Sequence, residues 1–193
     1  MFYYFFIPLI EQFNFLNLFK YITFRAGGAL FTALIISFIW GPFLIKKLKS
    51  FQKSGQPIRK DGPKSHLISK AGTPTMGGTL ILASLIISVL IWGNLSNVIV
   101  WLVLFITISF GMIGAIDDFQ KLKNNSSDGS NGKLRLLLEF TIAITFLYFL
   151  NYFSPEEIKN FISIPFTKGL VVNLELFYIP FGAFVIVGAA NSV

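Results

Sequence analysis

Long uncharged runs separated by short polar segments dominate the chain. Residues 26–45 form the first run, which is long enough for one helix to cross a bilayer. The second run, 71–116, is too long for one helix, and the polar segment 93–97 divides it into spans at about 74–92 and 98–116. Two more apolar runs predict spans at about 136–153 and 176–193. The pattern therefore predicts an all-α integral membrane protein, with one membrane domain of five transmembrane helices over residues 1–193.

Two other segments have patterns of their own. In residues 2–19, aromatic and aliphatic side chains recur at helical spacing between polar ones, and Pro8 interrupts the run. This pattern predicts an interfacial amphipathic helix rather than a span. Residues 162–166 and 170–174 flank a short turn around Gly169, which predicts a short hairpin.

Composition and charge support the membrane assignment and orient the chain. The sequence is 54% hydrophobic and only 13% charged, and it has no cysteine, which excludes disulfides and thiolate chemistry. Twelve of its 16 Lys and Arg residues lie in the segments 46–70 and 121–135. The positive-inside rule therefore predicts that the loops 46–73 and 119–135 are cytoplasmic, and that the amino terminus and residues 154–175 lie outside. Because the basic residues flank spans, the net charge of +7 favours lipid headgroups or a phosphorylated substrate over nucleic acid.

Two adjacent carboxylates, Asp117 and Asp118, end the third apolar run, and no charged residue lies between Lys70 and Asp117. A carboxylate at the bilayer centre costs roughly 3 kcal/mol, so the pair marks the point where a span meets water. On a helix, Lys121 shares a face with Asp117 and can partly balance the pair. Acids beside a base at a membrane surface suit a bound cation and a phosphate. A solvated helix end is the alternative.

The segment 70–78 opens the second span and is rich in glycine and threonine. Thr73 could cap a helix with Pro74 at its first position, which would leave free amides that attract phosphate beside Lys70. Its glycines have the spacing of a P-loop, but Gly78 stands where that motif needs lysine, which excludes the motif. Glycines that allow close helix packing are the alternative.

Four further polar residues lie near span ends, and a fifth lies in the basic loop 46–73. Lys133 and Arg135 precede the fourth span, where topology alone or phosphate binding could explain them. Glu139 lies about one turn inside that span, so a nearby Arg or Lys partner is expected. Asn191 could pack between helices or contact a substrate. His66 is the only histidine and cannot form a histidine metal site.

Together these segments resemble the phospho-N-acetylmuramoyl-pentapeptide-transferase family (translocase I), which belongs to the polyprenyl-phosphate sugar-1-phosphate transferases. The resemblance rests on residues 23–28, 59–63, 65–66, 70–78, 114–118 and 187–193. It implies a ten-helix fold in the bacterial inner membrane with a cytoplasmic active site and a possible homodimer. This chain would be the amino-terminal first half of that fold, truncated at its carboxyl end.

The resemblance also implies an activity. Phospho-N-acetylmuramoyl-pentapeptide would pass from its UDP-linked precursor to undecaprenyl phosphate, giving lipid I and UMP in peptidoglycan synthesis, with Mg²⁺ as cofactor. Asp117 and Asp118 are then the catalytic candidates. The substrate-binding candidates are Lys70, Thr75, Lys121, Lys133 and Asn191.

The aspartates would divide two tasks, one helping to hold magnesium and the other orienting Lys121. The main metal ligand is expected beyond Val193, so the chain alone is expected to be inactive. Two alternatives stay open: a transferase for another nucleotide sugar, and a non-catalytic transporter part or lipid-binding membrane protein.

Overall fold

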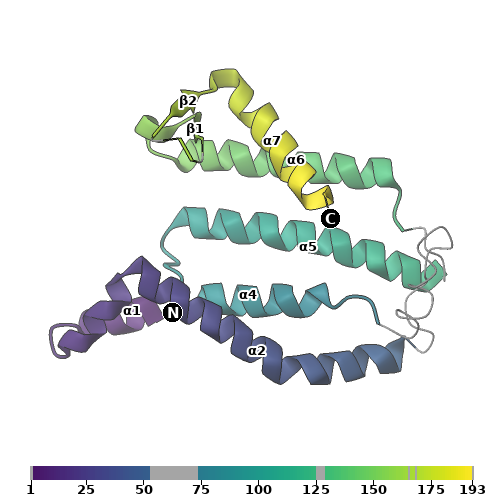
Figure 1. Cartoon of the computed structure of the whole chain (residues 1–193), viewed down its shortest axis with the longest axis horizontal. Helices are drawn as coiled ribbons and strands as arrows, with labels where there is room; N and C mark the ends of the chain where they lie inside the picture. Colours follow the sequence, from purple (N-terminus) through teal and green to yellow (C-terminus); the bar gives the residue numbers. More distant parts are fainter. Residues whose placement is uncertain (1, 53–73, 125–128, 165, 168, 193) are drawn as a thin grey trace.

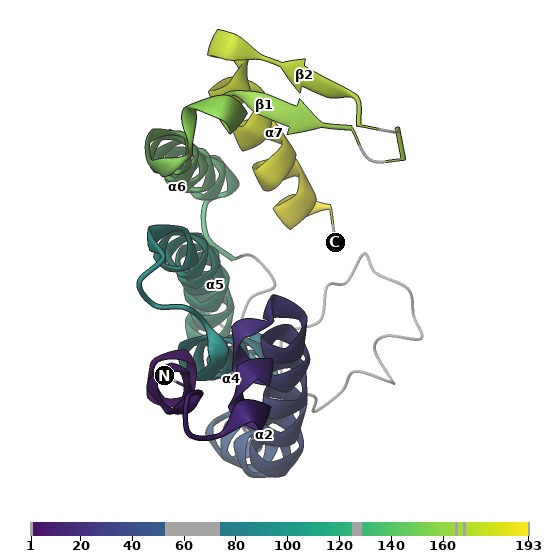
Figure 2. The ribbon, with the colours of Figure 1, turned by 90° about the vertical axis from the view of Figure 1, so that its left-hand side faces the viewer.

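The computed structural model describes residues 2–52, 74–124, 129–164, 166–167 and 169–192. Within these residues, apolar helices pack on one another in chain order (Figure 1). They are α2 (Ile22–Phe51), α4 (Gly78–Trp92), α5 (Val98–Asn124), α6 (Gly132–Phe153) and α7 (Tyr178–Asn191). Seen along the helices, α5 lies between the α2–α4 pair and the α6–α7 pair (Figure 2). The mostly helical fold class is thus confirmed.

Three helices of the described part, α2, α5 and α6, are long and apolar enough to cross a bilayer. Residues Gly78–Trp92 and Glu175–Asn191 form shorter apolar helices. All five predicted spans therefore coincide with apolar helices, but the crossing of the membrane by the two shorter ones stays a prediction. Many large apolar side chains on these helices are exposed, Phe38 at 78% among them, as expected for a surface that faces lipid.

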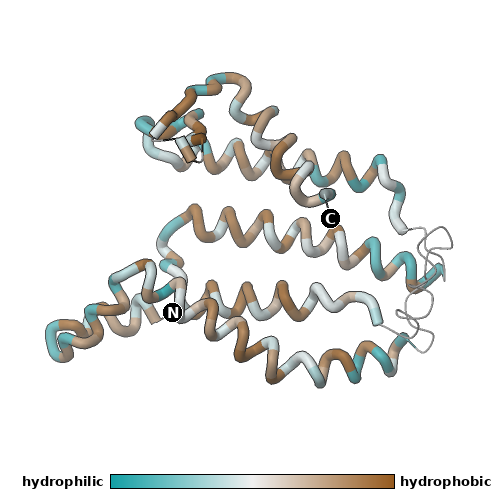
Figure 3. The backbone as a smooth tube through the Cα atoms, in the orientation of Figure 1, coloured by the Kyte–Doolittle hydropathy of each residue, from teal (hydrophilic) through white to brown (hydrophobic). Residues whose placement is uncertain are grey.

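Several helix boundaries differ from those predicted. Helix α2 continues to Phe51, so Lys46, Lys47 and Lys49 lie on a helix and not in a loop. Helix α5 likewise continues through both aspartates to Asn124. The physical reason is that lysine and glutamine are good helix formers, so a helix can leave the membrane without ending there. Figure 3 shows the resulting hydrophilic ends of α2 and α5 beyond their apolar lengths.

The predicted start of the second span is wrong. Helix α4 begins at Gly78, with Gly77 as N-cap and no side-chain cap, so Pro74 lies before the helix. Thr73 lies outside the described residues. Met76 adopts a left-handed backbone conformation, with φ of 71°, immediately before the helix. The chain is directed here by contacts of Thr75 and Met76 with other helices, which the local pattern of residues 70–78 does not reveal.

The amino-terminal segment is not the single amphipathic helix that the spacing predicts. It forms α1 (Phe2–Phe6) and two 3₁₀ helices, η1 (Ile7–Leu9) and η2 (Asn14–Lys20). Pro8 lies inside η1, where its ring and missing N–H oppose a continuous α-helix. The segment packs through aromatic rings on the end of α4, where the Phe19 and Trp92 rings stack with centroids 5.8 Å apart.

The short hairpin is confirmed. Strands β1 (Phe161–Ser163) and β2 (Val171–Asn173) pair antiparallel, with Ile162 opposite Val172. A 3₁₀ helix, η3 (Glu156–Ile158), precedes β1, and another, η4 (Glu175–Phe177), leads into α7. In Figure 1 the hairpin lies at the same end of the helices as the amino-terminal segment. The opposite end carries the two aspartates, as the predicted topology requires.

Candidate functional site

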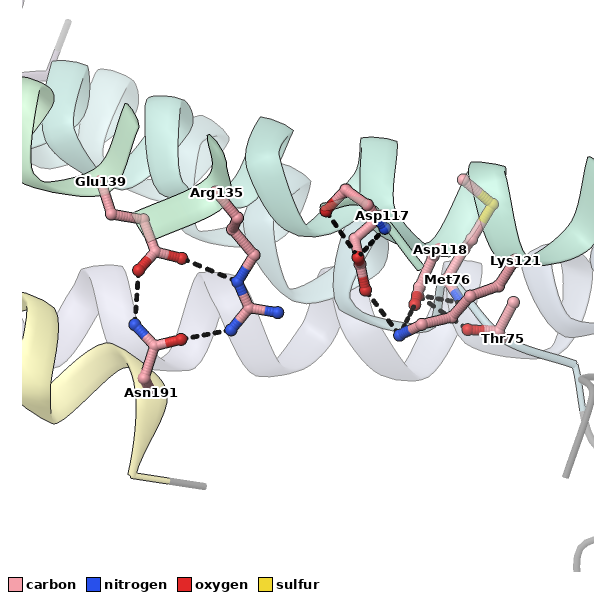
Figure 4. Close-up of polar contacts among 9 residues, drawn as sticks. Thr75, Met76, Asp117, Asp118, Lys121, Arg135, Glu139 and Asn191 are labelled. Atoms are coloured by element: carbon pink, nitrogen blue, oxygen red, sulfur yellow. Dashed lines mark hydrogen bonds and ion pairs between the residues drawn. The ribbon is translucent and has the colours of Figure 1, made fainter. Parts of the chain in front are cut away.

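Asp117 lies on α5 and is buried, with 6% of its surface exposed. Its Oδ2 atom is 2.5 Å from Lys121 Nζ, one helical turn further on, so the predicted pairing is confirmed. Its Oδ1 atom accepts hydrogen bonds from the Ser130 amide at 2.7 Å and the Ser130 hydroxyl at 2.8 Å. Both carboxylate oxygens of Asp117 are therefore engaged with protein groups (Figure 4).

The chain before α6 approaches Asp117 very closely at Gly129. A Cβ atom placed on Gly129 would lie 2.2 Å from Asp117 Oδ1, closer than real Cβ contacts occur. Glycine is therefore required there for Ser130 to reach the carboxylate. This contact ties the loop before α6 to the carboxylate end of α5.

Asp118 is more open than Asp117 and has different partners. Its Oδ2 atom accepts hydrogen bonds from the Thr75 hydroxyl at 2.7 Å and the Met76 amide at 3.3 Å. Its Oδ1 atom is 3.8 Å from Lys121 Nζ, and 31% of the side chain is exposed. Asp118 Oδ1 is thus the carboxylate oxygen of the pair that is least engaged by the described residues.

Thr75 also joins α2 to this site. Its amide donates to Gln52 Oε1 at 2.8 Å, and Gln52 Nε2 donates back to the Thr75 carbonyl at 3.2 Å. Thr75 therefore links three segments that are distant in sequence: the end of α2, the start of α4 and the end of α5. Beside them an open cleft of about 490 Å³ runs between α4 and α5, with both aspartates among its lining residues.

A second polar cluster joins α6 to the end of α7. Arg135 Nε donates to Glu139 Oε1 at 3.1 Å, and Arg135 Nη2 donates to Asn191 Oδ1. Asn191 Nδ2 in turn donates to Glu139 Oε2, which closes a ring of three side chains (Figure 4). Glu139 is only 4% exposed, so the expected arginine partner is confirmed for a buried carboxylate.

We expect Glu139→Ala to destabilise the protein by about 2 kcal/mol, because it removes one acceptor from Arg135 and one from Asn191. Thermal unfolding of the detergent-solubilised full-length protein measures the effect. Thr141→Ala is the matched control, since Thr141 is an exposed residue of α6 whose hydroxyl donates to the Leu137 carbonyl of its own helix. Equal stability of the two variants would contradict a structural role for the ring.

The structure brings together four of the residues proposed from the sequence: Thr75, Asp117, Asp118 and Lys121. Asn191 lies in the second cluster, where its amide contacts Arg135 and Glu139. Lys133 is exposed at the start of α6, beside the Asn131 cap. Lys70 and His66 lie outside the described residues. Substrate contacts of these residues stay predictions.

The sequence did not reveal four contributors to the site: Gln52, Met76, Gly129 and Ser130. Met76 acts through its backbone amide, which no residue type signals. Gly129 and Ser130 lie in a segment that reads as a flexible polar loop. The one available signal is the Gly129-Ser130 pair just before a helix, which indicates a turn that can approach another part of the chain closely.

In the described part of the chain, no group of three or more His, Cys, Asp or Glu side chains could hold a metal ion. A magnesium ion needs few protein carboxylates, however, because waters and substrate phosphates complete its six oxygen ligands. Of the two aspartates, Asp118 fits such an ion better, since its side chain is 31% exposed and Asp117 is buried against Ser130 and Lys121.

Comparison with known proteins gives a consistent result. Residues 70–82 match phospho-N-acetylmuramoyl-pentapeptide-transferase signature 1. The chain is 51% identical over 180 residues to a phospho-N-acetylmuramoyl-pentapeptide-transferase of Ruegeria sp. (strain TM1040), covering 93% of this chain and 50% of that protein. It is 51% identical over 177 residues to the enzyme of the same name from Dinoroseobacter shibae, covering 92% of this chain and 49% of that protein. The chain thus spans about half the length of the curated relatives it matches.

Proposed function

Because this chain belongs to the phospho-N-acetylmuramoyl-pentapeptide-transferase family, we propose that it provides the aspartate pair, Asp117 and Asp118, of a transferase active site. The proposed reaction transfers phospho-N-acetylmuramoyl-pentapeptide from its UDP-linked precursor to undecaprenyl phosphate and releases UMP. One observation carries the proposal beyond the family relationship. Asp118 is held by Thr75 inside the segment that matches the family signature, yet keeps Oδ1 partly free.

Electrostatic placement, not proton abstraction, is the main task proposed for the pair. A phosphate monoester has a second pKa of about 6, so the lipid acceptor is mostly dianionic at neutral pH and has little proton to lose. In the proposed reaction the attacking oxygen belongs to the lipid phosphate and the leaving oxygen to UMP, so both carry negative charge. The site therefore needs positive charge that is held in place more than it needs a base.

The contacts of the two aspartates support different roles. Asp117 is bound by Ser130 on one side and by Lys121 on the other, so it orients the Lys121 ammonium. Lys121 would stabilise negative charge on the diphosphate of the nucleotide substrate. Asp118, held through Oδ2 by Thr75, would direct Oδ1 to Mg²⁺. When bound, that ion would supply further positive charge beside the phosphates.

The membrane setting of the proposal follows from the family and the topology. The apolar helices and the relatives indicate a bacterial membrane protein. We propose the cytoplasmic membrane, with the aspartate end of the helices facing the cytoplasm, because most basic residues flank that end. A homodimer remains an expectation from the family.

The proposal is tested by measuring UMP release from UDP-N-acetylmuramoyl-pentapeptide by the full-length protein in the presence of undecaprenyl phosphate. Release that requires both the lipid and Mg²⁺ is expected. UDP-N-acetylglucosamine serves as the competing substrate. Its preferential use would identify a transferase of the related class, and no release with either substrate would contradict an enzymatic function.

Ser130→Ala should lower turnover about tenfold, because it removes one of the two donors that hold Asp117 Oδ1. The backbone donor remains, so the fold should be retained. Ser154→Ala is a suitable control, since Ser154 lies at the far end of α6 and its hydroxyl donates to the Leu150 carbonyl of that helix. Steady-state UMP release measures both variants. Unchanged kcat in Ser130→Ala would mean that this hydroxyl does not position Asp117.

A further inference from the structure

A second cavity lies at the end of the helices opposite to the aspartates. It has a volume of about 280 Å³ and is lined by the start of α2, the end of α4 and the start of α5. Its polar lining comes from Arg25, Asn94 and Asn97, and no carboxylate is among its lining residues. The three helix ends that form it lie together in Figure 1, beside the amino-terminal segment.

Arg25 is a cation without a counter-ion in the described part of the chain, whose ion pairs do not include it. Its Nε atom is buried and has no hydrogen-bond partner there. The guanidinium carbon lies 4.6 Å from the centre of the Tyr3 ring, so one face of the group is covered. A guanidinium that lines a cavity and has no ion-pair partner among the described residues favours an anion there, because guanidinium groups bind phosphate in a fork-like manner.

The surroundings of the cavity are those of a membrane boundary. Trp92 lines it, and Tyr3, Tyr4 and Tyr21 lie in the segment beside it, a grouping typical of the headgroup level of a bilayer. Ile22 also lines the cavity and is 73% exposed, so an apolar, lipid-facing surface begins at its rim. An anion that reaches this cavity from the bilayer would be a lipid headgroup with its acyl chains along that surface.

We propose that this cavity binds the phosphate of an acidic glycerophospholipid of the outer leaflet. Arg25 would provide the charge, and the side-chain amides of Asn94 and Asn97 would donate hydrogen bonds. Asn97 already uses Oδ1 to accept from the Ile99 amide at the start of α5, which leaves its NH₂ group as a donor for a ligand. A zwitterionic lipid fits less well, because its own ammonium group would compete with Arg25 for the phosphate.

The test is native mass spectrometry of the full-length protein in detergent, with phosphatidylglycerol or phosphatidylcholine added. Preferential retention of phosphatidylglycerol is expected, and Arg25→Ala should reduce it about tenfold, as for one lost charge-assisted hydrogen bond. Lys20→Ala is the control, since Lys20 is a nearby exposed cation that does not line the cavity. Equal retention by the wild type and Arg25→Ala would overturn the proposal.

A second variant keeps the test valid if Arg25→Ala fails to fold. Asn97→Asp preserves the cap of α5, because aspartate caps as well as asparagine, but it adds a carboxylate to the cavity. Loss of phosphatidylglycerol from this variant is expected, and normal retention would contradict the site. Inorganic phosphate is added in a separate arm. If phosphate displaces the lipid only at high concentration, a lipid headgroup is supported as the bound anion. Arg25-dependent binding of phosphate without binding of lipid would overturn the proposal.

Discussion

Replacing Asp118 with asparagine in the full-length protein is expected to lower kcat for UMP release about a thousandfold. The amide can still accept from the Thr75 hydroxyl, so the local fold should persist. The charge at the Oδ1 position, which we propose faces magnesium, is lost. Lys123→Ala is the matched control, because Lys123 is an exposed residue at the end of the same helix.

The dependence on magnesium distinguishes Asp118 from Asp117. Asp118→Asn should raise the Mg²⁺ concentration needed for half-maximal turnover. Asp117→Asn should also lower kcat strongly, through Lys121, with little change in that concentration. Turnover near wild type in both variants, from about pH 6 to about pH 9, would contradict any catalytic role for the pair.

The second large effect is expected from Gly129→Ala, with a fall in kcat of about a hundredfold. The added Cβ would lie 2.2 Å from Asp117 Oδ1, so the loop must move away and take Ser130 with it. A shift of about 1 Å in a catalytic group commonly costs about a hundredfold in rate. Because the change lies in the loop before α6, substrate affinity at more distant contacts should change less than kcat.

The first residue of α6, Gly132, offers a matched control for that variant. A Cβ on Gly132 would meet nothing within 4 Å, so Gly132→Ala should leave turnover within about twofold of the wild type. Both variants are compared by steady-state UMP release and thermal unfolding. Similar activity of the two would mean that the close approach of Gly129 to Asp117 has no catalytic consequence.

The sequence pattern predicted the contacts that depend on helical periodicity and on the need to solvate buried charge. Asp117 and Lys121 pair as their spacing predicts, since residues four apart share a helix face. Glu139 has an arginine partner because a buried carboxylate needs one. The order of the apolar helices and the hairpin followed from the lengths of apolar runs and a turn signal.

What the sequence did not predict depends on contacts between distant segments. Helix α4 starts at Gly78, and the chain before it is held by Asp118 and Gln52, which lie far away in sequence. Ser130 reaches Asp117 through a loop whose composition suggests only flexibility. The amino-terminal segment divides into short helices because packing on α4 and Pro8 outweigh its amphipathic spacing.

The proposed active site requires that the aspartate end of the helices faces the cytoplasm. Single cysteines at Gly77, Lys123 and Gly132, introduced into a cysteine-free full-length protein, test it directly, with Ser96 as the site at the opposite end. We expect an impermeant maleimide to label the first three only in inverted membrane vesicles and Ser96→Cys only in right-side-out vesicles. Labelling of Gly77→Cys, Lys123→Cys or Gly132→Cys in right-side-out vesicles would contradict that orientation, and labelling of the three from different sides would mean that they do not belong to one site.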